Sequence, residues 1–187
     1  MENLYTYIKL HTELSEKSWN ALKRVLTTRR YRKGESLLDI GEICTSIFFI
    51  SEGYCRAVYN HEGQEINTNF YFEGELTTNI RSLKQEQGSE YTIQAEEDLE
   101  AVIFDKDTLY TLFSKSREID SMGRKLMEGI LARQEEQAKL FKLNTARKRY
   151  DYMQRIQPQV LQRVPLERIA SYLGVSLDTL RSIHELT

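Results

Sequence analysis

The sequence has few of the residues that cross-link a chain or anchor it in a membrane. Only two of its 187 residues are cysteines, Cys44 and Cys55, so it supports neither a disulfide framework nor a cysteine-ligated cluster. Both thiols are expected to be reduced core residues. No apolar run approaches the ~18 residues of a membrane-spanning helix, and the N-terminus lacks a basic stretch followed by an apolar block. We therefore expect a cytoplasmic protein with no membrane partner.

Catalytic and metal-binding patterns are also missing from the sequence. No nucleophile–base signature is present, and the three histidines, His11, His61 and His184, stand in three different contexts. Hydrophobic residues make up 40% of the chain, which is enough for a folded core. The sequence therefore predicts a folded protein with no enzymatic activity, no bound metal and no resident cofactor.

Charge is distributed unevenly along the chain. Residues 144–187 contain seven Lys and Arg against four Asp and Glu, a balance of +3, whereas the whole chain carries −2. This asymmetry indicates that the C-terminal end meets a polyanion. Ordinary scatter of surface charge gives the same count, so the balance alone decides nothing.

The period of the apolar residues changes along the first hundred residues. Residues 1–26 have helical spacing, with Ser15 as a plausible N-cap. From about residue 27, short β-rich runs alternate with glycines, and residues 60–63 (NHEG) read as a hairpin turn. Many short strands at this spacing predict an antiparallel barrel or jelly roll, and with the helices around it the fold class is α+β.

A long helix is predicted over 117–142. At ~1.5 Å per residue it is about 39 Å long, which exceeds what a small barrel covers. One face therefore suits the barrel and another suits a second copy, although the helix could also pack on its own domain only. Gly129, Arg133 and Gln137 break the heptad, so a strict coiled coil is not expected. A further helix is predicted over 144–156, followed by an irregular link over 158–165.

The most specific pattern is the C-terminal stretch VPLERIASYLGVSLDTLRSIHELT. Residues 166–173 predict one short helix, Gly174 the left-handed residue that ends it, and Ser176 the cap of a second helix. Ala170 is small enough for a close crossing. The spacing favours a helix-turn-helix over a generic helical hairpin, with an apolar seam made by Ile169, Leu173, Val175, Leu180 and Ile183.

These motifs together carry a family resemblance. The order RKGESLLDIGE, FISEGYCRAVY, a Gly-Glu-Leu loop, a long helix and IASYLGVSLDTL resembles the cyclic-AMP receptor protein/FNR (Crp/Fnr) family of transcription regulators, in a short Bacteroidetes-like form. The resemblance implies a cyclic-nucleotide-binding-like sensor domain (1–115), a dimerisation helix (116–143) and a helix-turn-helix DNA-binding domain (144–187). It implies a homodimer through 117–142, double-stranded DNA as partner, RNA polymerase as a further candidate partner, and no catalysis.

In members of the family that bind cyclic nucleotides, the Gly-Glu of the loop holds the ribose and an Arg-Ser or Arg-Thr pair faces the phosphate. Gly74, Glu75 and Leu76 match the first half, but Ser89 stands at the Arg position with Glu90 beside it. A lost charge pair ~4 Å apart is worth about 4 kcal/mol at an effective dielectric near 20. We therefore expect no cyclic AMP binding of the usual kind.

Another, unidentified effector is left open. We expect Arg81 and Lys84 to be surface residues rather than substitute anchors for a phosphate. The aromatic residues of the loop either line a pocket for a neutral ligand or simply fill the barrel. The candidate ligand-binding residues are Tyr71, Phe72, Gly74, Glu75, Leu76, Ser89, Glu90 and Tyr91.

The second helix of the helix-turn-helix is expected to read DNA in the major groove. Arg181 is the candidate for guanine, Asp178 for cytosine and Leu177 for a thymine methyl. The full DNA-binding set is Ser176, Leu177, Asp178, Thr179, Arg181, Ser182 and His184, with phosphate contacts expected from Arg147, Lys148, Arg149, Arg163 and Arg168. Compared with its family, this chain carries its arginine one residue earlier. The alternative is therefore a ligand-binding module whose degenerate helix-turn-helix serves protein contacts.

Overall fold

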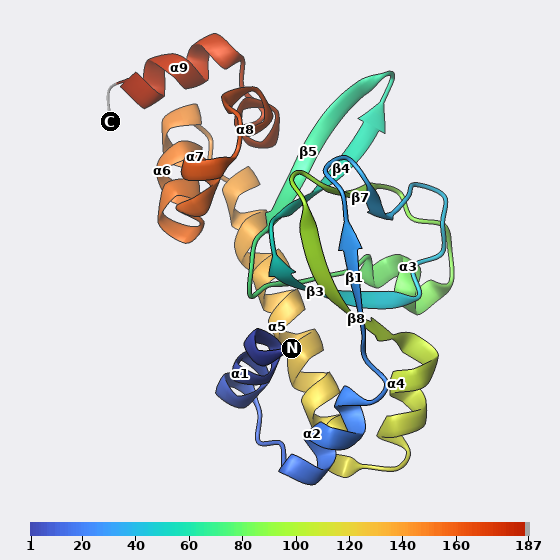
Figure 1. Ribbon diagram of the computed structural model, residues 1–187. Helices are drawn as coiled ribbons and strands as arrows, with labels where there is room; N and C mark the ends of the chain where they lie inside the picture. Colours follow the sequence, from blue (N-terminus) through green and yellow to red (C-terminus); the bar gives the residue numbers. More distant parts are fainter. Residues whose placement is uncertain (186–187) are drawn as a thin grey trace.

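Two four-stranded antiparallel sheets form a β-barrel that helices cover at one end and along one side (Figure 1). The computed structural model describes residues 1–185, so the last two residues of the predicted C-terminal domain lie outside it. The predicted α+β architecture is confirmed. One sheet has the order β1-β8-β3-β6 and the other β2-β7-β4-β5. Their bounds are β1 Thr27–Tyr31, β2 Ser36–Leu38, β3 Ser46–Glu52, β4 Cys55–His61, β5 Gln64–Tyr71, β6 Leu76–Thr77, β7 Thr92–Ala95 and β8 Leu99–Asp105.

The β4–β5 hairpin has the turn that the sequence predicts. His61 pairs with Gln64, and the two residues between them, Glu62 and Gly63, both have positive φ, 52° and 83°. Such a turn matches the twist of the flanking strands. The Asn60 side chain accepts the Gly63 N–H at 3.1 Å and so fixes the turn.

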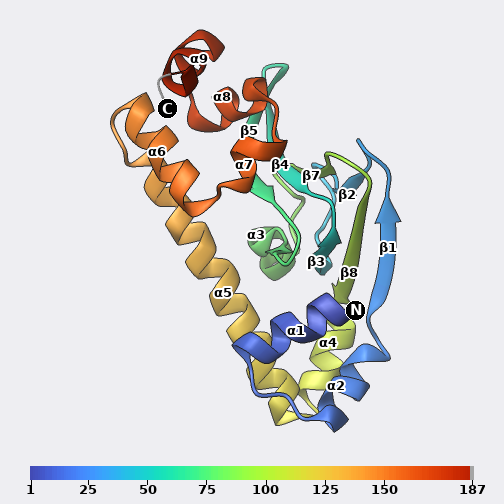
Figure 2. The ribbon, with the colours of Figure 1, turned by 60° about the vertical axis from the view of Figure 1, so that its left-hand side comes forward.

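The predicted N-terminal helical region consists of two helices, α1 (Glu2–His11) and α2 (Glu16–Lys23), rather than one. The break follows from two polar residues. Thr12 adopts extended backbone and ends α1, and the Ser15 hydroxyl caps α2 by accepting the Ser18 N–H at 3.2 Å, as predicted. With α4 (Lys106–Phe113), these helices pack on the N-terminal half of α5 (Figure 2).

Helix α5 (Arg117–Phe141) runs along the barrel from the N-terminal helices to the C-terminal ones (Figure 2). Arg133 and Gln137, which we expected to break the heptad, contact barrel residues and so lie on the barrel-facing side. The exposed side carries a set of residues at three-four spacing that includes the polar Arg124 and Gln134, so it does not contradict the expectation that α5 forms no strict coiled coil. The repeat consists of Arg124, Met127, Leu131, Gln134, Ala138 and Phe141.

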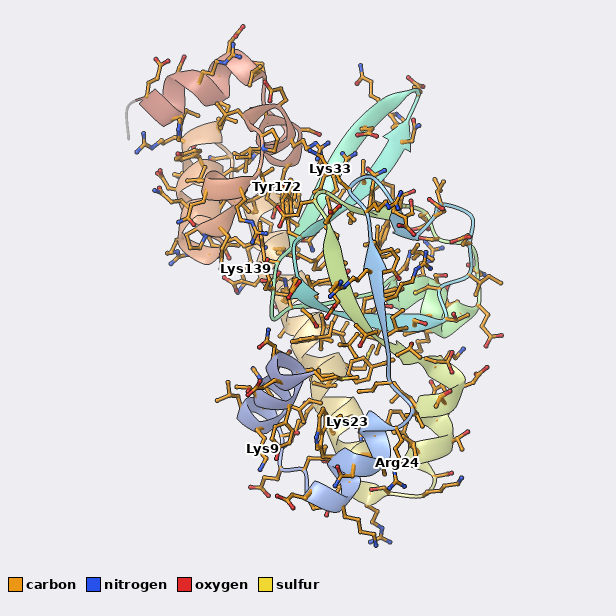
Figure 3. All side chains as sticks on the ribbon, viewed as in Figure 1. Lys9, Lys23, Arg24, Lys33, Lys139 and Tyr172 are labelled. Carbon is orange, nitrogen blue, oxygen red and sulfur yellow. The ribbon has the colours of Figure 1, made fainter. Side chains whose placement is uncertain are left out.

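Four short helices follow α5. Residues 158–165, which we predicted to be irregular, contain α7 because Pro158 adopts helical dihedrals and starts it. The four helices share an apolar core with the barrel, and this core contains Tyr172, which is labelled in Figure 3. The ring centroids of Tyr172 and Phe70 are 5.3 Å apart. Their bounds are α6 Ala146–Ile156, α7 Gln159–Arg163, α8 Leu166–Leu173 and α9 Leu177–Glu185. Over residues 1–185, every helix is too short or too polar to cross a bilayer.

Candidate nucleic-acid interface and effector loop

The C-terminal helices have helix-turn-helix geometry. Helix α8 ends at Gly174, whose φ of 63° is left-handed, and the Val175 N–H returns to the Ala170 carbonyl at 3.0 Å. The Ser176 hydroxyl then accepts the Thr179 N–H at 3.1 Å and starts α9. The predicted end of α8 at Gly174 and the predicted cap of α9 at Ser176 are both confirmed. The predicted seam is buried or half-buried in one core and consists of Ile169, Ala170, Leu173, Val175, Leu180 and Ile183.

The side of α9 that faces away from this core is polar. Arg181 is half-exposed, and its guanidinium lies 3.9 Å from the Asp178 carboxylate. Leu177 is half-buried, so it offers less apolar surface for a thymine methyl than the sequence suggested. The exposed residues of the predicted DNA-binding set are Ser176, Asp178, Thr179, Arg181, Ser182 and His184.

His184 differs from the other exposed residues of this set. Its Nδ1 lies 2.8 Å from the Tyr150 hydroxyl of α6, and the two rings meet edge to face with centroids 6.1 Å apart. The imidazole is therefore held toward α6. This contact favours a role in fastening α9 to its domain.

Three of the five arginines and lysines expected to contact phosphates are used inside the protein. Arg149 donates to the Leu143 carbonyl at 2.9 Å and to the Leu173 carbonyl at 2.7 Å. Arg163 pairs with barrel carboxylates at Glu73 and Glu97, and Arg168 pairs with the barrel acid Glu96. The expectation that these three project to DNA is therefore wrong for this conformation. Arg147 and Lys148 stay exposed at the start of α6.

A buried charge cluster joins the helix-turn-helix to the barrel. Glu96 follows strand β7 and is 5% exposed. One of its oxygens lies 2.6 Å from Nε of the buried Arg56, and the other pairs with Arg168 of α8. Burial, and then the neighbouring Arg56 charge, lower the pKa of Arg168. Arg56 is also 2.6 Å from Glu65. The positive balance of the C-terminal segment is thus partly a complement to barrel acids.

The loop that resembles a cyclic-nucleotide site is occupied by its own side chains. One oxygen of Glu75 accepts the Phe72 N–H at 2.8 Å, and the other pairs with Arg133 of α5. Burial raises the pKa of Glu75, and the Arg133 charge opposes this. The carboxylate expected to hold a ribose therefore has two partners already.

The second half of the loop has no fixed cation where a phosphate would sit. Ser89 is 3% exposed; its hydroxyl accepts from the Asn79 amide at 2.9 Å and donates to the Tyr91 carbonyl at 2.6 Å. Glu90 pairs with Arg81 at the surface, which agrees with the expectation that Arg81 is solvated. The structure thus closes this half of the loop by internal hydrogen bonds.

The aromatic residues of the loop belong to the cores of the protein. Tyr71 lies in the barrel interior, where burial raises its pKa to about 12, and Tyr91 packs against the same cluster. Phe72 stacks on Tyr54 at 5.2 Å, in the core shared with the C-terminal helices. This packing favours the filling role that the sequence left open. Within residues 1–185, no group of three or more His, Cys, Asp or Glu is arranged to hold a metal.

Sequence reasoning missed an apolar cavity of about 450 Å³ between α3 (Ile80–Gln85), α4, α5 and the barrel. None of the eight predicted ligand-binding residues lines it. One signal in the sequence was Gly123, inside the long helix. A Cβ there would lie 2.7 Å from Cε1 of Phe113, so the glycine lets that ring pack against the helix backbone.

Comparison with known proteins agrees with this architecture. Residues 28–116 match the family of the cyclic nucleotide-binding domain. FixK2 from Bradyrhizobium japonicum superposes with a TM-score of 0.69 at 17% identity, covering 87% of this chain and 84% of FixK2. A Eubacterium rectale protein described as a Crp/Fnr family regulator has a TM-score of 0.67 at 17% identity, covering 97% of this chain and 87% of that one.

The chain has the Crp/Fnr fold. The fold that the resemblance implied is thus confirmed. The c-di-GMP responsive global regulator CLP of Xanthomonas campestris shares this fold, with a TM-score of 0.65 at 15% identity over 92% of this chain and 91% of CLP. No curated protein sequence matches the chain. At these sequence identities the comparisons show the fold of the chain.

Proposed function

We propose that this Crp/Fnr-type chain is a dimeric, DNA-binding transcription regulator without enzymatic activity. The observation that carries the proposal is α9, whose one side is buried against α6 and α8 while the other presents an exposed polar face. A helix held in this way can enter a major groove. Arg181 supplies the guanine donors and Asp178 an acceptor for cytosine.

Dimerisation is part of the same proposal. The exposed repeat of α5 carries Met127, Leu131 and Phe141, the last two of which are 51% and 53% exposed. Apolar side chains at three-four spacing on two such helices form a parallel seam. A dimer also doubles the phosphate contacts, which matters because only Arg147 and Lys148 of the expected basic set stay exposed.

We further propose that the barrel does not bind cyclic AMP in the usual way. Glu75 is engaged by Arg133, and no guanidinium stands at Ser89. A nucleotide would have to displace the Arg133 pair and bring its phosphate next to Glu90. Calorimetric titration with cyclic AMP is expected to give no saturable binding at micromolar concentrations.

Selection from random duplex DNA at two salt concentrations tests the regulator proposal. The wild type is expected to enrich a two-fold symmetric motif, and Arg181→Ala to relax one position of each half-site, by about 1–3 kcal/mol of discrimination. Arg117→Ala, exposed at the far end of α5, is the matched control and should keep the motif. Absence of any enriched motif would instead support a helix-turn-helix that serves protein contacts.

A further inference from the structure

The 450 Å³ cavity lies outside the loop that resembles a nucleotide site. Its walls come from the barrel strands β3 and β8, from α3, and from the consecutive helices α4 and α5; in Figure 1, α3 lies beside the barrel and α4 lies below it. Its lining is mainly apolar. The lining residues that are buried in the protein are Ile47, Phe104, Leu109, Met122 and Leu126. Cavities of 300–1,000 Å³ with such a lining hold small organic ligands.

Charged side chains on the cavity lining are arranged unequally. Lys84 of α3 and Lys106 at the start of α4 stand on one side, where Glu86 pairs with Lys106 at 2.7 Å. On the α5 side, Arg124 pairs with Asp120, and Glu128 adds a second carboxylate to the lining. The α3–α4 side therefore has two cations for one carboxylate. An apolar cavity with a positive edge complements a molecule with a hydrocarbon tail and an anionic head.

We propose that this cavity binds an amphipathic monocarboxylate of medium chain length. The tail lies against Phe104, Leu109 and Leu126, and the carboxylate meets Lys84 and Lys106. The site is distinct from the Gly74–Glu75 loop, and its binding of ligand does not depend on DNA recognition.

A second copy of the chain is the competing occupant, and the geometry disfavours it. Three of the six residues of the exposed α5 repeat, Arg124, Met127 and Leu131, line the cavity, and all three are exposed or half-buried. The lining residues Met122 and Leu126 are on the buried side of α5. A partner helix, about 10 Å wide with its side chains, thus lies across the rim and leaves the interior for a small molecule.

The position suggests how the ligand acts, a step that rests on the proposed function. A molecule in the cavity contacts Leu83 of α3 on one side and Leu131 of the α5 repeat on the other. Occupancy is therefore coupled to dimerisation, and ligand affinity and dimer affinity change by the same factor.

Calorimetric titration of the full chain with hexanoate, octanoate and decanoate tests the proposal. We expect one site per chain, with each added methylene strengthening binding by up to about fourfold, the equivalent of about 0.8 kcal/mol. Octanoate should bind at least tenfold more tightly than 1-octanol, and octyltrimethylammonium should not bind. Equal affinity for the acid and the alcohol, or the absence of saturable binding, overturns the proposal.

Variants locate the site. Lys84→Gln with Lys106→Gln should weaken octanoate binding at least tenfold, whereas Lys115→Gln with Lys125→Gln, both exposed and off the cavity, should not. Leu83→Trp fills the cavity and should abolish binding, with its melting temperature measured alongside. Glu75→Gln should leave octanoate affinity unchanged. Loss of binding in Glu75→Gln, or in both lysine pairs equally, places the ligand elsewhere and refutes the assignment.

Discussion

Arg168 of α8 forms an ion pair with Glu96, a buried acid at the end of strand β7. The pair joins the helix-turn-helix to the barrel, and the other oxygen of Glu96 pairs with Arg56. Two guanidiniums thus share one carboxylate at the junction. The position of α9 relative to the barrel depends on this cluster and on Arg163, which pairs with Glu73 and Glu97.

Replacing the shared acid Glu96 should lower the free energy of unfolding more than replacing Arg168. Glu96→Gln leaves Arg56, whose side chain is 3% exposed, with Glu65 as its remaining carboxylate. Breaking a buried pair from one side costs about 3 kcal/mol or more. In Arg168→Gln, Glu96 keeps Arg56, so we expect about 1–2 kcal/mol. Urea unfolding of both variants checks the order; a larger loss for Arg168→Gln would contradict the shared-acid description.

Two glycines of α5 should respond oppositely to alanine. At Gly129 an added Cβ meets nothing within 4 Å, so Gly129→Ala should stabilise the protein by about 0.5–1 kcal/mol through helix propensity. At Gly123 the Cβ collides with the Phe113 ring. Overpacking typically costs about 1–3 kcal/mol, so Gly123→Ala should be destabilising. Thermal unfolding distinguishes them, and equal shifts of the same sign would show that Phe113 moves freely.

The α5 repeat should be sensitive to charge at one position and not at its neighbour. Leu131→Glu places a carboxylate in the seam and should convert the protein to monomers, because two buried like charges face each other. Ala132→Glu adds the same group about 100° around the helix, outside the repeat, and should leave the dimer intact. Sedimentation velocity measures both. A wild type that is monomeric at high concentration contradicts the seam.

Acidification should loosen the junction through Glu73. Its pKa is below the ordinary 4.5: burial opposes this, but the Arg163 guanidinium and the Gly53 N–H outweigh it. A carboxyl group whose pKa is lowered on folding stabilises the protein above its unfolded-state value, and that stability is lost as pH falls through the folded value. Stability should therefore fall below about pH 4.5, and less steeply in Arg163→Gln. Arg30→Gln, at an exposed pair, is the control and should keep the wild-type slope.

Local patterns allowed the helix-turn-helix to be predicted closely. The left-handed Gly174 and the Ser176 cap are decided within a few residues, so α8 spans the predicted residues and α9 begins where the sequence placed its start. The hairpin at Asn60–Gly63 is equally local. Helix α7 was missed because Pro158 reads as a breaker, although proline is well tolerated in a first turn.

Long-range partners account for what sequence reasoning could not find. Arg133 and Glu75 are 58 positions apart, and no local sequence pattern predicts that they form an ion pair. In the same way, Arg163 and Arg168 count as free cations until the barrel acids that face them are known. The cavity depends on the meeting of α3, α4 and α5, which the period of each segment does not reveal.

The amides of Asn69 and Gln137 hydrogen-bond each other in the interior, between strand β5 and helix α5. Sliding the helix by one turn, about 5.4 Å, would strand both amides without partners in a dry environment. This amide pair therefore favours a single packing register of helix α5 against the barrel. Any change in the barrel that shifts α5 along its axis therefore has to break this amide pair.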